Sequence, residues 1–313
     1  MTNDNAMTHS PLVAEPNSPT PVARPRPFYW SVQRELWENR SIYIAPLIAA
    51  GVVLLGFVIT AFRLPHLRRN ALALEPTRMR AAIEMPYDMA ALMIMFVAFI
   101  VGIFYTLDAL HGERRDRSIL FWKSMPVSDL TAVLAKAFIP LVVMNVLTFV
   151  IVVATHSVML LTSTAALLPS GLAGTTWTHL PYGRLWVMLA YALVTTTLWQ
   201  APFYAWLLLV SGWARRATFL WAVLPWLAIC AIEKLVFDTG AFARMLVGRV
   251  TGNIEGAFVV VHHGRETHVP IVDRLTQLDP LRFFSTPGLW IGLVVAAAFF
   301  FAAVRLRRYR GAL

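Results

Sequence analysis

Six long apolar stretches constrain this chain more than any other feature of its sequence. Each is close to the ~20 residues that cross the hydrocarbon core of a bilayer as a helix. Five of them carry no charged side chain, and the fifth in order reaches its full length only if Glu233 and Lys234 lie at the membrane interface. We therefore predict an all-α membrane protein with six transmembrane helices. The predicted spans are residues 41–62, 89–107, 137–161, 185–210, 217–237 and 283–304.

The composition excludes a soluble enzyme. Of the 313 residues, 58% are hydrophobic and only 14% are charged, whereas about 25% are charged in an average soluble domain. A mean hydropathy of +0.62 leaves too little polar surface to cover two water-soluble domains. The only cysteine, Cys230, lies in an apolar stretch, so a zinc ribbon and an iron–sulfur cluster held by thiolates are excluded as well.

Basic residues between the spans predict the orientation of the chain in the membrane. With the N-terminus in the cytoplasm, 15 of the 27 Lys and Arg residues fall on the cytoplasmic side and 12 on the other. We therefore place both termini in the cytoplasm and the chain in the plasma (inner) membrane. The proline-rich residues 1–27 are predicted to be a disordered cytoplasmic tail and 309–313 a second short tail. The scattered basic residues form no stripe that predicts nucleic-acid binding.

Residues 28–40 have the pattern of an amphipathic helix that lies flat on the membrane before the first span. At 100° per residue, polar and charged side chains gather on one arc and apolar ones on the other. A short helix with tryptophan and charge divided in this way is typical of the headgroup layer. The polar arc holds Ser31, Arg34, Glu35 and Glu38, and the opposite arc holds Tyr29, Val32, Leu36 and Trp37.

Ionisable residues in the spans are few, and most lie at span ends. Asp88, Asp108, Lys136, Glu233 and Lys234 occupy such ends, where interfacial anchoring is the favoured interpretation. His156 alone lies inside a span, and a satisfied polar contact is favoured over a proton relay. His262, His263 and His268 lie in a predicted hairpin with no acidic or cysteine ligand nearby, so a surface turn is favoured over a metal site.

The segment between the second and third spans is the most informative part of the sequence. Residues 107–136 combine a mixed-charge cluster with an aromatic pair, Phe121 and Trp122, and with Pro126, which ends any local helix. Ser128 or Asp129 is the predicted N-cap of the third span. Aromatic and arginine side chains commonly anchor protein interfaces. The alternative is that both aromatic side chains dip into the membrane interface.

These features together resemble the membrane subunits of ABC-2 type transporters. The resemblance covers about residues 28–308 and is strongest over 112–136, where G-E-x-x-x-x-S-I-L-F-W-K-S-x-P-V-S-D leads into A-K. It implies that 113–123 form a helix that couples to an ATPase subunit and that 28–40 form an elbow helix with Arg34, Glu35, Trp37 and Glu38. The implied coupling residues are Glu113, Arg114, Arg115, Asp116, Arg117, Phe121, Trp122 and Lys123.

The resemblance implies the permease subunit of an ATP-driven exporter. The sequence has no phosphate-binding loop and no other nucleotide motif, so this chain is expected to be no enzyme and to bind no cofactor, with ATP used by a separate ABC ATPase. Two permeases are expected to pair as a homodimer or heterodimer in the lipid bilayer. The alternatives are an ion-driven secondary transporter and a non-transporting immunity or regulatory membrane protein.

Overall fold

The computed structural model describes residues 27–118, 120, 127–252, 257 and 278–309. Within these residues the regular elements are all helices and no strand is present. Six of the helices are long and apolar enough to cross a bilayer. The prediction of an all-helical membrane protein with six candidate spans is therefore confirmed.

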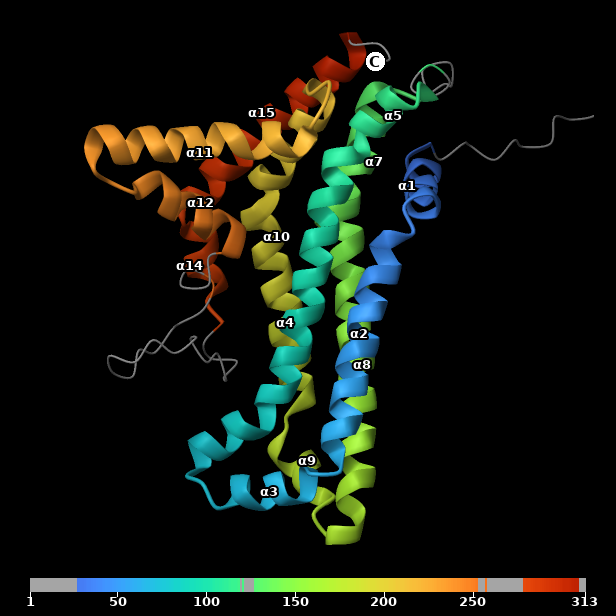
Figure 1. The fold of residues 1–313 in the computed structure, drawn as a ribbon, viewed down its shortest axis with the longest axis vertical. Helices are drawn as coiled ribbons and strands as arrows, with labels where there is room; N and C mark the ends of the chain where they lie inside the picture. Colours follow the sequence, from blue (N-terminus) through green and yellow to red (C-terminus); the bar gives the residue numbers. More distant parts are fainter. Residues whose placement is uncertain (1–26, 119, 121–126, 253–256, 258–277, 310–313) are drawn as a thin grey trace, which may run out of the picture.

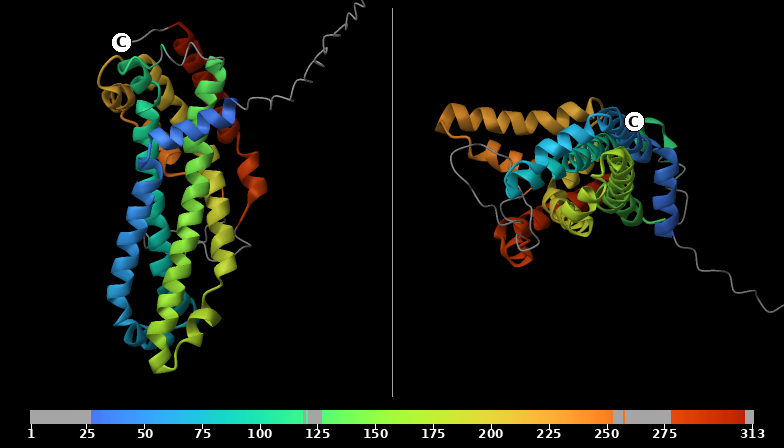
Figure 2. Two further views of the ribbon diagram at one scale, coloured as in Figure 1. Left: turned by 90° about the vertical axis from the view of Figure 1, so that its right-hand side faces the viewer. Right: turned by 90° about the horizontal axis from the view of Figure 1, so that it is seen from below.

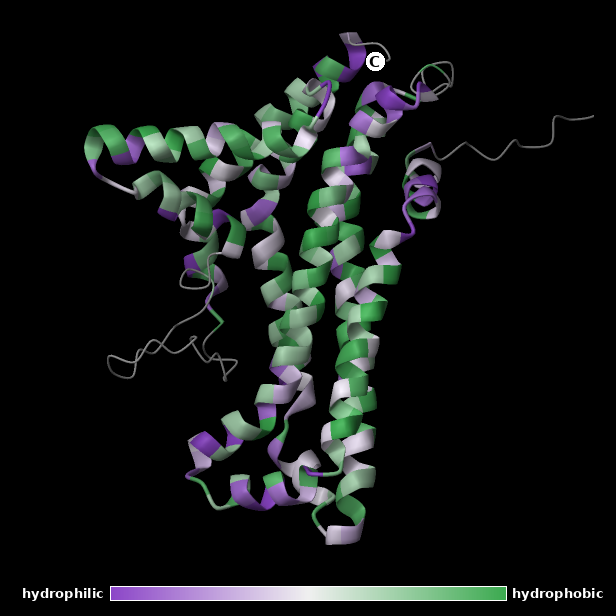
Figure 3. Ribbon diagram, in the orientation of Figure 1, coloured by the Kyte–Doolittle hydropathy of each residue, from purple (hydrophilic) through white to green (hydrophobic). Residues whose placement is uncertain are grey.

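A bundle of four long helical segments forms the body of the molecule (Figure 1). They are α2 (Ser41–Ala61), α4 (Pro76–Ala109), α8 (Met144–Leu167) and α10 (Tyr182–Trp213), which contact one another along the long axis. Small residues permit close packing: Ala49 and Ala50 of α2 lie buried with Ile94 of α4 and Val152 of α8. Figure 3 shows an apolar middle between two polar ends, as a bilayer requires.

The third span is longer than the sequence suggested. It comprises α7 (Asp129–Phe138), a π-helical turn (Ile139–Val143), α8 and a final 3-10 turn (Leu168–Ser170). The π turn includes Pro140, which lacks the N–H that a regular helix needs. Ser128 caps α7 by accepting a hydrogen bond from the backbone N–H of Thr131, as predicted.

Two segments that were predicted to be loops contain helices. Ending the third predicted span at residue 161 left 162–184 as a predicted loop, and this is wrong for most of the stretch: the helix continues to Ser170, α9 (Gly174–His179) follows Gly171 with φ 72°, and α10 begins at Tyr182. Residues 63–88 form α3 (Leu64–Leu72) and the first turns of α4, which begins at Pro76. Proline fits the first position of a helix because its missing N–H is unpaired there in any case.

The C-terminal part packs against only one side of the bundle. α15 (Pro287–Tyr309) lies beside α10, and α12 (Ala241–Thr251) and α14 (Pro280–Ser285) lie near the middle of the same helix. α11 (Thr218–Phe237) has the length and apolarity of a span, yet it projects sideways from the bundle in Figures 1 and 2, with Ala222 as its one buried residue. Its direction differs from that of the other candidate spans.

Candidate functional site: a buried charge network

Charged side chains from four helical elements meet inside one end of the bundle. These elements are α1 (Pro27–Glu38), the short α5 (His111–Arg115), α7 and the last turn of α15. Figures 1 and 2 show all four together at one end of the bundle, the upper end in Figure 1. We call the following six side chains the charge network: Arg34, Glu35, Glu113, Asp129, Lys136 and Arg307.

Glu35 is the most buried member of the charge network, with 1% of its surface exposed. Its Oε1 accepts hydrogen bonds from Nζ of Lys136 at 2.8 Å and from Nη2 of Arg34 at 2.6 Å. Its Oε2 accepts a third from the Tyr105 hydroxyl of α4 at 2.9 Å. One carboxylate therefore ties α1 to both α7 and α4.

Glu113 is the second central carboxylate. Its Oε1 lies 3.1 Å from Nη2 of Arg34 and 3.2 Å from Nζ of Lys136. Its Oε2 lies 3.2 Å from Nη2 of Arg307, and Nη1 of the same arginine lies 2.5 Å from Oδ1 of Asp129. Glu113 thus joins α5 to three other helices, and the Arg307 pair spans 194 residues of sequence.

The charge network is formally neutral, because three carboxylates face three cations. Isolated charges in a medium of low dielectric constant are strongly unfavourable, and pairing with hydrogen bonds offsets much of that free energy. Removal of one partner from such a buried pair typically destabilises a protein by about 3–5 kcal/mol. The network therefore holds the four elements in one relative position.

The ionisation of Glu35 follows from its surroundings. Burial alone raises the pKa of its carboxyl group, but the ion pairs with Lys136 and Arg34 outweigh burial and leave the pKa below its usual value. Glu35 is therefore charged at neutral pH. Only the ionised carboxylate is attracted to the cations Lys136 and Arg34, so the folded protein favours the charged form of Glu35.

α1 is oriented with part of its polar arc toward the protein. Glu35 is buried and Val32 and Leu36 pack beside it on the core. Tyr29, Trp30 and Trp37 are more than half exposed on the outer side. Of the four residues predicted to lie opposite Glu35, Tyr29 and Trp37 do face outward, but Val32 and Leu36 pack on the core on the same side as Glu35, so that part of the prediction is wrong. Glu35 faces α7, whereas Glu38 on the same predicted arc is half-exposed.

The remaining predicted residues of α1 take different positions. Arg34 pairs with Glu35 and Glu113 and, more loosely, with the half-exposed Glu38, whose Oε1 lies 3.6 Å from Nε of Arg34. Trp37 is 64% exposed. Of the four residues assigned to the elbow helix, the structure brings Arg34 and Glu35 into the charge network and leaves Trp37 and Glu38 at its surface.

α5 is held against the end of α10 by its own side chains and backbone. Nη1 of the buried Arg114 donates to the carbonyl oxygen of Gly212 at 2.6 Å, and a cation is favourable at that C-terminal end of α10. The backbone N–H groups of Leu110 and His111 both donate to Oγ of Ser211. Glu113 and Arg114 are thus interior residues, although the resemblance assigns both to a segment that contacts another subunit.

A continuous helix over 113–123 is also wrong. α5 ends at Arg115, and Arg117 has a φ of 58°, a left-handed conformation that interrupts a helix. Arg115 and Asp116 are exposed and pair with each other at 3.0 Å. Phe121, Trp122 and Lys123 lie outside the described residues, as do His262, His263 and His268.

The burial of Lys136 was not predicted from the sequence. It was interpreted as an interfacial anchor because it stands at the end of a span, yet it is 3% exposed and bound to two carboxylates. Asp129, Arg307 and Tyr105 were not predicted as partners either. The helical wheel assigned Glu35 to the polar arc and Val32 and Leu36 to the other, so it did not indicate that Glu35 is buried, and nothing in the sequence identifies the partner 101 residues away.

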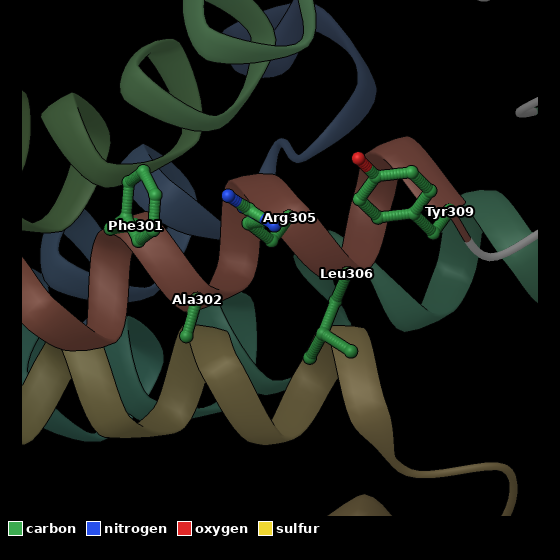
Figure 4. A pocket seen from close by; sticks show the side chains of 5 residues that line it. All are labelled: Phe301, Ala302, Arg305, Leu306 and Tyr309. Atoms are coloured by element: carbon green, nitrogen blue, oxygen red, sulfur yellow. The ribbon is translucent and has the colours of Figure 1, made fainter.

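Other candidate sites carry less chemistry. His156 is buried, and its Nε2 lies 3.0 Å from the carbonyl oxygen of Tyr87, the polar contact that was favoured from sequence. The pocket in Figure 4 is lined by α15 alone, with Phe301, Ala302, Arg305, Leu306 and Tyr309 along its surface. In the part of the chain that the structure describes, no group of His, Cys, Asp and Glu could hold a metal ion.

Comparison with known proteins adds no family assignment. No family model, curated protein or solved structure matches the chain.

Proposed function

We propose that the chain is the permease subunit of an ATP-driven ABC-2 type exporter. In this proposal a separate ABC ATPase docks beside α5, and two permeases, identical or different, form the path for the substrate. The observation that carries the proposal is the position of Glu113. It stands in the segment with the strongest family resemblance, and it pairs with cations of α1, α7 and α15.

The contacts of Glu113 support a mechanism for coupling. A force applied to the segment after α5 acts on Glu113 and Arg114, which are fixed to the ends of α1, α7, α10 and α15. Interfaces of this kind move as rigid bodies rather than deforming locally. Closure of the ATPase would therefore shift the spans together, while the charge network keeps their cytoplasmic ends in register.

The same proposal gives an orientation. α1, α5 and the end of α15 lie at one end of the bundle (Figure 1), and the proposal places this end in the cytoplasm. α1 then lies in the headgroup layer with Tyr29, Trp30 and Trp37 toward lipid, where tryptophan and tyrosine are favoured. Cysteine labelling from the periplasmic side tests this: a cysteine at the exposed Arg115 is expected to stay unlabelled and one at the exposed Arg69 to react.

Purification with the ATPase tests the central claim. The chain is expected to recover an ABC ATPase from its native membrane, and the rigorously pure chain is expected to show only background ATP hydrolysis. From the sequence, Trp122→Ala and Phe121→Ala should reduce ATPase recovery, whereas the membrane-belt alternative predicts reduced stability of the permease and unchanged recovery.

Two variants separate docking from coupling. Arg115→Glu changes an exposed side chain and is expected to reduce ATPase recovery without a change in permease stability. Glu113→Gln removes a buried charge and is expected to leave recovery measurable while it abolishes stimulation of hydrolysis by substrate. Wild-type recovery and wild-type stimulation in both variants would contradict the proposal.

A further inference from the structure

The opposite end of the bundle holds a buried cation without an ion pair. Arg68 of α3 is 4% exposed, and within the described residues no carboxylate lies within ion-pair distance of it. Its Nη2 donates to Oγ1 of Thr176 in α9 at 3.3 Å, and its Nη1 is buried with no hydrogen-bond partner among the residues that the structure describes. Glu84 of α4, a buried carboxylate in the same half of the chain, is paired with Arg184 at 2.6 Å.

The electrostatic surroundings of Arg68 do not compensate its burial. Burial lowers the pKa of its guanidinium group, and the only groups that act in the opposite direction are the phenols of Tyr87 and Tyr182. A buried, unpaired cation is strongly unfavourable. A water molecule could satisfy Nη1, but it would leave the positive charge without a counterion.

A second buried donor lies along the same cluster of rings. Tyr182 contacts Tyr87 and, one helical turn further along α10, Trp186, at ring separations of 6.0 and 6.4 Å. Nε1 of Trp186 is buried, and no described residue accepts a hydrogen bond from it. An indole N–H and a guanidinium can only donate, so both unpaired groups require an acceptor.

The sequence around Arg68 is rich in positive charge. Residues 63–80 contain five arginines and a single acidic residue, Glu75. Such a surface raises the local concentration of anions.

We propose that Arg68, with Thr176 and Trp186, binds a phosphate group of an anionic ligand at the α3 end of the bundle. The planar guanidinium fork matches the geometry of phosphate oxygens. The phosphate belongs either to a lipid headgroup or to a soluble ligand. This inference does not depend on the ATPase partner.

Thermal unfolding of the full chain in a neutral detergent tests the site, with inorganic phosphate as one probe and chloride at equal ionic strength as its control. Phosphate is expected to raise the Tm of the wild type saturably. Arg68→Gln is expected to weaken the apparent affinity at least tenfold, whereas Arg69→Gln, which removes the exposed neighbouring arginine, is expected to retain it. An equal loss in both variants would show a surface charge effect and overturn the proposal.

Nanodiscs distinguish the two sources of phosphate. A higher Tm in phosphatidylglycerol than in phosphatidylcholine, lost in Arg68→Gln, supports a lipid headgroup; a response to inorganic phosphate alone supports a soluble ligand. No response to either probe in the wild type overturns the proposal.

Two further variants guard against a folding defect. Trp186→Phe keeps an aromatic ring but removes the Nε1–H donor, and Arg68→Lys keeps the charge but removes the fork; each is expected to weaken phosphate binding less than Arg68→Gln does. Without ligand, Arg68→Gln is expected to be at least as stable as the wild type, because it removes an uncompensated charge. If all three variants bind phosphate with wild-type affinity, the assignment of these residues is wrong.

Discussion

Buried cations at the two ends of the bundle differ in whether they are paired with carboxylates. At the α1 end, Lys136 and Arg307 are almost fully buried and each contacts two carboxylates. At the α3 end, Arg68 is buried to the same extent and has one hydroxyl partner. A fully paired network fixes the relative position of helices, whereas an unpaired cation is suited to binding something the chain itself does not supply. The difference predicts opposite responses to the same kind of substitution.

Removal of Lys136 is expected to produce the largest effect. Lys136→Met keeps most of the volume but leaves Glu35 and Glu113 short of a buried cation, and we expect a loss of about 3–5 kcal/mol in the free energy of unfolding. Chemical unfolding in detergent measures it. Lys234→Met is the matched control, since that lysine is 69% exposed and pairs only with Asp238, and pairs of this kind contribute little.

A double substitution sharpens the result. Glu35→Leu combined with Lys136→Met replaces the buried pair by apolar side chains, which is often close to neutral. We expect the double variant to recover part of the stability that Lys136→Met loses. If the double variant loses more free energy of unfolding than the two single variants lose together, the network does not act through charge pairing.

The pH dependence of stability at the α1 end follows from Glu35. Its pKa is lowered by folding, from a usual value of 4.5, so its contribution is present above that value and is lost as the pH falls through the lowered pKa. We therefore expect the Tm to fall as the pH drops below about 4.5, and to fall less steeply in Glu35→Gln. Parallel pH profiles for the two proteins would contradict this assignment.

One buried tyrosine at each end allows the strength of a hydroxyl hydrogen bond to be compared directly. The hydroxyl of Tyr105 donates to the charged Glu35 at 2.9 Å, whereas that of Tyr87 lies 3.1 Å from the neutral hydroxyl of Ser163. A hydrogen bond to a charged group contributes about 1.5–3 kcal/mol and a neutral one about 0.5–1.5 kcal/mol. Tyr105→Phe should therefore destabilise the protein more than Tyr87→Phe, as measured by chemical unfolding. Equal losses of unfolding free energy in the two variants would contradict a stronger hydrogen bond at the α1 end.

The sequence predicted the helices better than it predicted their ends or their partners. Apolar runs identify spans because the bilayer imposes a length, but a helix continues past the apolar run when backbone hydrogen bonds and packing favour it, as α4 and α8 do. The burial of Lys136 could not be predicted for a related reason: a charge at the end of a span is equally compatible with an interface and with a paired interior. Only the fold brings Glu35, Glu113 and Lys136 together.

Substitution of Arg115 is expected to have the smallest effect on stability, and it serves as the exposed control for Arg114 at the α1 end. It lies one residue beyond Arg114, but its side chain is 59% exposed and pairs with the exposed Asp108 and Asp116. Water and salt screen such pairs, so Arg115→Ala should leave the Tm of the protein unchanged, while Arg114→Ala should lower it by removing the donors to Gly212 and Ala214. Thermal unfolding of both variants in one detergent checks this. A fall in Tm for Arg115→Ala as large as that for Arg114→Ala would mean that exposed charges also hold α5 in place, and Arg115 would then be a poor choice for separating ATPase docking from stability.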